Sequence, residues 1–273
     1  IAVESPTYYG LLQIIDSLGL KALEIPTDPR TGISIDALQL ALEQWPIKAC
    51  VIVPNFSNPL GALMPDENKQ DLVALFNQHP DTFLVEDDIY GDLHFEGPRP
   101  SLLKTLDTQG NVIHCASFSK TLSPAMRIGW VVNEALIEPL QYQKFVANCA
   151  TNTLGQLTAT ELLSSGFYDR HLRTLRTMLN RSMNRVTESV ARHFPADVKA
   201  SQPQGGMSIW IELAKGTDCT KIASAALNQH ISIAPGALFA SSQSKYQHCM
   251  RLNCAIDQSQ PVDDVIRTLS SLI

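Results

Sequence analysis

The chain has 273 residues, of which 44% are hydrophobic and 18% are charged, and its formal net charge is −6 at pH 7. This composition is typical of a folded globular protein with room for one large or two small domains, and it excludes disordered and fibrous proteins. No apolar run approaches the roughly 20 residues that span a membrane, so we expect no membrane contact and no secretory leader. The acidic balance lacks the surplus of Lys and Arg that nucleic acid requires, so any DNA contact is expected outside this stretch.

The cysteines and the first residues narrow the class of protein further. Six cysteines are scattered without a CxxC pair and without histidines at zinc-finger spacing. We therefore expect reduced thiols in a cytoplasmic protein, and no metal site. The chain opens with IAVESPTYYG, which has no initiator Met and begins like the middle of a strand, so we expect an N-terminal part of the protein to be missing.

Strand patterns alternate with helical patterns in the first half. Runs of strand length, rich in β-branched and aromatic residues, occupy residues 48–56, 82–90, 111–118 and 127–133. Their nearly continuous apolar character predicts strands that are buried on both faces. Leu, Val and Phe recur at three- and four-residue spacing in residues 35–45 and 65–79, which predicts helices. This alternation indicates an α/β fold with an open, mostly parallel sheet.

The second half has a different organisation. A long helical stretch runs from about residue 156 to 194, is broken near Ser165-Gly166, and is rich in Arg, with Glu188 as the only acid after Asp169. Patterns of strand, helix, strand and helix follow at residues 205–213, 220–230, 249–255 and 262–273. We expect a large domain over residues 1–155, and the long helix with a smaller α+β domain over residues 156–273.

Polar side chains follow three of the predicted strands, where the ligand of an open α/β sheet binds. They are an amide in NPLG, a carboxylate and a phenol in DDIYG, and a lysine with hydroxyls and an arginine in SFSKTLSPAMR. Each alone has a simpler interpretation, as a turn, a solvated strand end or a surface lysine. Asp87, however, shares one face of its strand with Phe83, Val85 and Ile89, and a lone carboxylate among apolar neighbours needs a cationic partner.

These motifs, in this order, resemble the class I/II aminotransferase family of fold-type I pyridoxal phosphate enzymes. Five segments match segments of the family: SPTYYG, NPLG, DDIYG, SFSKTLSPAMRIGW and MRLNCA. Two further segments match landmarks of its small domain, QGGMSIWIEL and APGALF. The resemblance covers essentially the whole chain. It implies the aspartate aminotransferase-like fold, a pyridoxal 5'-phosphate cofactor and a homodimer.

The resemblance assigns residues around the cofactor ring. It implies that Lys120 forms the Schiff base with pyridoxal phosphate and acts as the catalytic base. Tyr90, also catalytic, and Asn58 would hydrogen-bond the ring oxygen, and Asp87 would keep the ring nitrogen protonated. Tyr8 would lie on the ring.

The resemblance also assigns residues to two anionic groups. Ser117, Ser119 and Arg127 match the segment that holds the cofactor phosphate. Ala125 stands where the family commonly has Gly. Arg251 matches the arginine that grips a substrate carboxylate, which implies an amino-acid-like ligand; the alternative for Arg251 is a structural ion pair.

Two functions of different classes fit this set of residues. The chain most resembles the aminotransferase-like domain of GntR-family MocR-type transcriptional regulators. Two segments carry this resemblance, EDDIYGDLHFEGPRPSLLKTLD and VESPTYYGLLQIIDSLGLKALEIPTDPRTGI. Such a domain would sense an amino acid or amine, and would reach DNA only through the missing N-terminal domain. The alternative is a free-standing aminotransferase. A third possible function is that of a degenerate domain that only dimerises, and the intact set of site residues disfavours it.

Overall fold

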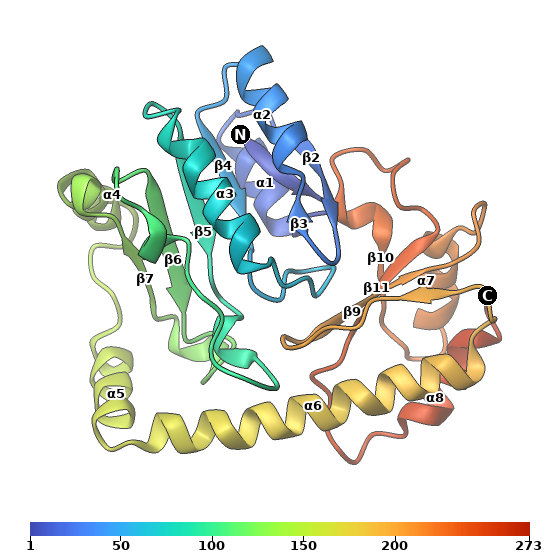
Figure 1. Ribbon diagram of the computed structural model, residues 1–273. Helices are drawn as coiled ribbons and strands as arrows, with labels where there is room; N and C mark the ends of the chain where they lie inside the picture. Colours follow the sequence, from blue (N-terminus) through green and yellow to red (C-terminus); the bar gives the residue numbers. More distant parts are fainter.

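The computed structural model describes all 273 residues, which form two β-sheets and the helices around them (Figure 1). The larger sheet has seven strands in the order β3-β2-β1-β4-β5-β6-β7. Its strands are β1 (Ala2–Ser5), β2 (Leu23–Asp28), β3 (Gly32–Ile33), β4 (Ala49–Ile52), β5 (Phe83–Asp87), β6 (Val112–Ser117) and β7 (Gly129–Val132). β2, β1, β4, β5 and β6 run parallel, whereas β3 and β7 are antiparallel to their neighbours at the two edges.

Helices cover the large sheet and connect it to the small one. They are α1 (Tyr9–Ser17), α2 (Ile35–Gln44), α3 (Asp66–Asn77), α4 (Ile137–Asn148), α5 (Thr153–Ser164), α6 (Phe167–His193), α7 (Cys219–Leu227) and α8 (Val262–Ser270). Capping fixes several starts: the side chains of Ser34, Asn152 and Asp218 accept hydrogen bonds from the first turns of α2, α5 and α7. Short 3₁₀ turns lie at Gly91–Leu93, Lys104–Leu106, Pro124–Met126, Glu134–Leu136 and Gly236–Phe239.

The order of the strands determines where a ligand can bind. From β1 the chain adds β2 and β3 on one side, and then crosses to add β4, β5 and β6 on the other side. β1 and β4 are therefore the point at which the strand order reverses, and a crevice opens beyond their carboxyl ends. Sixteen buried residues, Leu38, Leu72, Phe76 and Leu84 among them, form the core between this sheet and α2 and α3, which holds these strand ends in register.

The small sheet is antiparallel and packs on the long helix. Its order is β10-β11-β9-β8, with β8 (Lys199–Ala200), β9 (Ser208–Glu212), β10 (Ala234–Pro235) and β11 (Cys249–Asn253). A second core of sixteen buried residues joins β9 and β11 to α6, α7 and α8. In Figure 1, α6 runs beneath both sheets, from α5 on the left to α8 on the right. The division between residues 155 and 156 remains a prediction.

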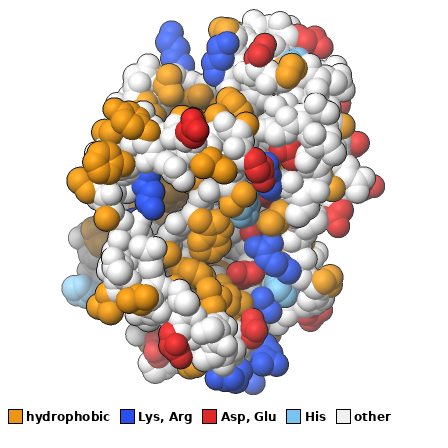
Figure 2. All heavy atoms as spheres, turned by 90° about the vertical axis from the view of Figure 1, so that its left-hand side faces the viewer, with side chains coloured by type: hydrophobic (Ala, Val, Ile, Leu, Met, Phe, Trp, Pro, Cys, Tyr) orange, Lys and Arg blue, Asp and Glu red, His pale blue; other side chains and the backbone are white.

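One edge of the large sheet is exposed, contrary to the sequence-based expectation. All four residues of β7 are exposed and no strand pairs with its outer edge, whereas the apolar run at 127–133 predicts a strand buried on both faces. α4, which follows β7, has no buried residue. Apolar side chains gather on this face of the molecule (Figure 2).

The predicted fold class and most predicted elements are confirmed. The predicted strands match β4, β5, β6, β7, β9 and β11, and the predicted helices match α2, α3, α7 and α8. The long helical stretch is α5 and α6, separated by Ser165 and Gly166 as predicted. No helix is both long enough and apolar enough to cross a membrane.

Candidate active site

The crevice beyond the carboxyl ends of β1, β4, β5 and β6 contains a hollow of about 500 Å³. All nine residues selected from the sequence line it: Tyr8, Asn58, Asp87, Tyr90, Ser117, Ser119, Lys120, Arg127 and Arg251. The first eight lie at the carboxyl ends of these strands or in the segments that follow them, and the ninth comes from β11 of the small sheet. The structure therefore brings the whole predicted set together, from both halves of the chain.

Alternation along β5 separates the three consecutive acids. Glu86 is fully buried and accepts hydrogen bonds from the backbone N–H of Leu103 at 2.7 Å, while its other oxygen lies 3.0 Å from His114 Nδ1. Asp88 is also buried, and it pairs with Arg99 and accepts from Asn55 Nδ2 at 2.6 Å. Asp87 alone lines the hollow, so the two outer acids are structural.

The surroundings of the Asp87 carboxylate favour a cationic ligand beside it. No cation of the chain forms an ion pair with it, although the sequence predicts the need for one. Burial and the neighbouring Asp88 raise the pKa of Asp87 to about 6, and the Ile89 backbone N–H and His114 oppose this shift. A protonated ring nitrogen beside Asp87 would supply the missing positive charge.

Tyr90 and Asn58 contribute a phenol and an amide to the lining of the hollow. Both are buried, and Tyr90 also belongs to a small apolar cluster with Val53, Phe56 and Leu93. Burial raises the pKa of Tyr90 to about 12, so its phenol stays protonated and can donate a hydrogen bond at neutral pH. Asn58 Oδ1 accepts from Arg251 Nη1 at 3.4 Å.

The segment after β6 turns so that hydroxyls and a guanidinium face the same space. The Ser119 backbone N–H donates to Ser117 Oγ at 3.3 Å, and the Phe118 N–H donates to the Ile128 carbonyl at 3.1 Å. Arg127 has φ of 53° and ends a 3₁₀ turn that begins with Pro124. With Lys120, these side chains line one end of the hollow and could hold an anion and a carbonyl group.

Arg251 crosses from the small domain into the site. Its guanidinium carbon lies 5.7 Å from the centroid of the Phe239 ring, and its Nε is buried without a hydrogen-bond partner. The side chain forms no ion pair with a carboxylate of the chain. This geometry disfavours the structural ion pair and fits an arginine that binds the carboxylate of a ligand.

The hollow also contains residues that sequence reasoning missed. Tyr9 lies beside Tyr8, with ring centroids 4.7 Å apart, and Asn253, Met207 and Ser208 approach from the small domain. Asn253 could have been found, because it follows Arg251 by two residues on one strand and so lies on the same face. Met207 and Ser208 could not, because only the packing of the two domains brings them to the site.

The residues present fit pyridoxal phosphate as an anionic, aromatic, carbonyl-bearing group. Asp87 suits its ring nitrogen, Lys120 its aldehyde, and Ser117, Ser119 and Arg127 its phosphate. The unpartnered Nε of Arg251 leaves a donor for a second anion, such as the carboxylate of an amino acid.

Comparisons with known proteins identify the family of the chain. A family model described as aminotransferase class I and II matches residues 1–269. The chain is 38% identical over its whole length to the HTH-type transcriptional regulator YjiR of Escherichia coli, of which it spans 58%. It is 29% identical over its whole length to aromatic-amino-acid aminotransferase 1 of Thermococcus litoralis, of which it spans 66%.

A solved relative adds the fold and the cofactor. The kynurenine aminotransferase of Pyrococcus horikoshii, crystallised with PMP, superimposes with a TM-score of 0.93 at 30% identity, over 99% of this chain and 68% of that one. This agrees with the aspartate aminotransferase-like fold and the pyridoxal phosphate cofactor expected from the sequence. The chain belongs to the class I and II aminotransferase family.

Proposed function

We propose that the chain is the pyridoxal phosphate-binding, aminotransferase-like effector domain of a GntR-family MocR-type transcriptional regulator, which senses an amino acid or an amine. The observation that carries the proposal is the complete set of site residues in a chain whose 38% identical relatives are named HTH-type regulators. The chain spans 58% of these relatives, so the DNA-binding part of the regulator would belong to the remainder of their length.

In this proposal the chain's own residues bind the cofactor and move one proton. Pyridoxal phosphate, when bound, supplies an electron sink that acidifies the α-carbon of an attached amine. Lys120 would be the attachment point for its aldehyde and, once the amine of the ligand has displaced it, the free base that accepts the α-proton. Asp87 would stabilise the positive charge on the ring nitrogen, Tyr90 and Asn58 would hydrogen-bond the ring oxygen, and Tyr8 would pack on the ring. Arg251 orients the ligand through its carboxylate.

A free-standing aminotransferase is the second candidate, because the same hollow would transfer an amino group between an amino acid and a 2-oxo acid. The 29% identity to an enzyme named aromatic-amino-acid aminotransferase 1 favours it. Function depends on the site, and both candidates have the same site, so the fold does not distinguish them.

The attachment of the cofactor is tested by reduction with borohydride followed by peptide mapping. The label is expected on Lys120, and a Lys120→Arg variant is expected to lose the label and the absorbance of the attached cofactor. Lys144, which is exposed on α4, provides the matched control. Labelling of any lysine other than Lys120 would contradict the assignment.

The mass of the native gene product separates the two candidates. A regulator needs the rest of the large domain and a DNA-binding domain, for a mass above about 50 kDa, whereas an aminotransferase needs only the former, for about 40 kDa. With a product of the larger mass we expect operator binding that changes when the cofactor and an amine are added. Rapid amino-group transfer by a product of the smaller mass would establish the enzyme instead.

A further inference from the structure

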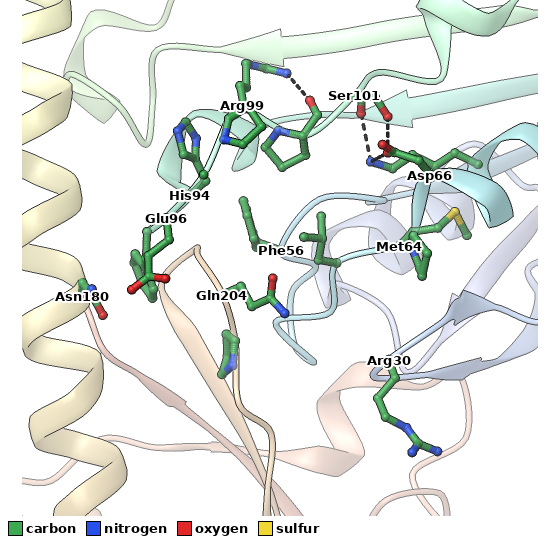
Figure 3. Close-up of a pocket in the computed structure, with 18 residues that line it drawn as sticks. Arg30, Phe56, Met64, Asp66, His94, Glu96, Arg99, Ser101, Asn180 and Gln204 are labelled. Atoms are coloured by element: carbon green, nitrogen blue, oxygen red, sulfur yellow. Dashed lines mark hydrogen bonds and ion pairs between the residues drawn. The ribbon is translucent and has the colours of Figure 1, made fainter.

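A hollow larger than the candidate active site lies elsewhere in the molecule. It measures about 870 Å³ and shares no lining residue with the crevice that holds Lys120. Its walls are the loop after β4, the segment His94–Ser101, α6, and the segment Pro203–Gln204 (Figure 3). In Figure 3, Asn180 on α6 and Glu96 face the open space from one side, and Arg30 and Met64 lie on the other side.

A second hollow of about 540 Å³ adjoins the first along α6. The two share residues 94–97 and Asn180. The other wall of the second hollow carries three arginines of α6, Arg173, Arg176 and Arg181, and the only acid that lines it is Glu96. We call this second hollow the α6 groove. It accounts for part of the Arg-rich pattern that the sequence shows in this helix.

The arginines of the α6 groove have no carboxylate partner. Arg176 Nε donates to the backbone carbonyl of Asp92 at 2.7 Å, and the exposed side chains of Arg173 and Arg181 form no hydrogen bond or ion pair with the rest of the chain. Elsewhere Arg99, Arg192 and Arg267 each pair with an aspartate.

The same lack of a carboxylate partner is found at Arg127 and Arg251, which line the candidate active site. Both are proposed to bind an anionic group of a ligand there. Uncompensated guanidinium groups around a hollow repel one another, and an anion that enters relieves the repulsion. Burial and the nearby positive charge of Arg176 also lower the pKa of His94, which lines the same groove.

The walls of the groove are fixed by backbone hydrogen bonds. The Phe95 N–H donates to the Gln204 carbonyl at 2.9 Å, and the Gly206 N–H donates to the Leu93 carbonyl at 3.0 Å. These bonds connect residues 93–95 to the loop before β9, and the bond from Arg176 to Asp92 connects the preceding turn to α6. The arginines therefore face a preformed wall, so only the arginine side chains themselves need to be ordered when a ligand binds.

We propose that the α6 groove binds the oligophosphate group of a small soluble molecule. Guanidinium groups match phosphate oxygens as paired donors. Arg173 and Arg181 are eight residues apart on one helix, about 12 Å at 1.5 Å per residue, which suits two or three linked phosphates better than one. Asn180 and Asn184 add amide donors, and the volume lies within the range of small-molecule sites. The proposal is independent of the function proposed above.

Titration calorimetry of the full-length protein with inorganic tripolyphosphate tests the proposal. The protein is first saturated with pyridoxal phosphate, so that Arg127 is not available to the probe. We expect saturable binding that the double variant Arg173→Gln/Arg181→Gln weakens at least tenfold. A double variant of two exposed lysines outside the groove, Lys48→Gln/Lys215→Gln, removes the same charge and is expected to leave binding unchanged.

A second variant tests the groove in case the arginine substitutions disturb the fold. Asn184→Asp places a carboxylate in the groove without removing an arginine, and it is expected to weaken tripolyphosphate binding at least tenfold. Absence of saturable binding, or equal weakening in the arginine and lysine variants, would overturn the proposal. A 20-bp duplex of random sequence is titrated in parallel, and Arg173- and Arg181-dependent binding of the duplex without binding of tripolyphosphate would also overturn it.

Discussion

At the scale of single residues, the structure separates the two anion sites of the crevice. Arg251 comes from the small domain and Arg127 from the segment after β6, and neither has a carboxylate partner. Arg251→Gln is expected to weaken the binding of an amino acid by roughly 10- to 100-fold, because one charge-assisted pair is lost. The affinity for pyridoxal phosphate should change less than twofold. Spectrophotometric titrations measure both, with Arg170→Gln as the control, and equal losses would show a structural role for Arg251.

Asp87 should make the protein without cofactor less stable as the pH rises. The pKa of Asp87 is raised to about 6, so its carboxyl binds a proton more tightly in the folded state than in the unfolded chain. The stability that the protonated carboxyl contributes at low pH is therefore lost as the pH rises through about 6. Asp87→Asn should therefore stabilise the apoprotein by up to about 3 kcal/mol at pH 8, and by about half of that at pH 5. Urea denaturation at the two pH values measures the difference. A gain that does not depend on pH would contradict the assignment, and in the holoprotein the variant should lose cofactor affinity.

At the scale of elements, α3 holds the loop that carries Asn58. Lys69 of α3 is fully buried, and its Nζ donates to Asn55 Oδ1 at 2.8 Å and to the Ser101 carbonyl at 3.0 Å. Lys69→Ala should destabilise the protein by about 3 kcal/mol, because it leaves buried acceptors unpaired. Thermal or urea unfolding measures the loss, and Lys48→Ala, at an exposed site without such bonds, should change little. Equal effects of the two variants would show that the network is dispensable.

The elements that the sequence predicts are those whose pattern is local. The repeats of α2 and α3 and the apolar runs of β4, β5 and β6 follow from side chains that face one core. α4 could not be predicted in this way, because none of its residues is buried and its apolar side chains mark no single face. The strands β3, β8 and β10 have two residues each, and only pairing with distant strands fixes them.

The site was predictable to the extent that it lies at strand ends. Asp87 ends a parallel strand, and Asn58 and Lys120 follow two others. The carboxyl ends of these strands meet at one edge of the sheet. The approach of Arg251 depends instead on how the small sheet packs against the large one, and the sequence indicates it only through family resemblance. The exposed side of β7 was not predictable, because an apolar run shows that a strand needs covering but not what covers it.

At the scale of the whole molecule, β7, α4 and α5 expose apolar side chains on one face (Figure 2). Tyr142, Phe145 and Val146 are each more than 60% exposed, as are Leu154 and Leu157. Exposed apolar patches of this kind mark protein–protein interfaces. α5 also packs against the turn that carries Arg127, since a Cβ at Gly155 would lie 3.1 Å from the Met126 carbonyl. We therefore propose that a second copy of the chain covers this face, close to the phosphate end of the site.

This homodimer can be tested by changing the face without touching the crevice. Phe145→Glu/Leu157→Glu places two charges on it, and sedimentation equilibrium should show a shift from dimer to monomer, because burying the charges opposes association. Leu227→Glu provides the matched control, since Leu227 on α7 is exposed to the same 64% as Leu157 but lies on the small domain. The control should remain dimeric. A double variant that keeps the mass of the dimer would show that the copies associate elsewhere, and that this face is covered by another part of the protein.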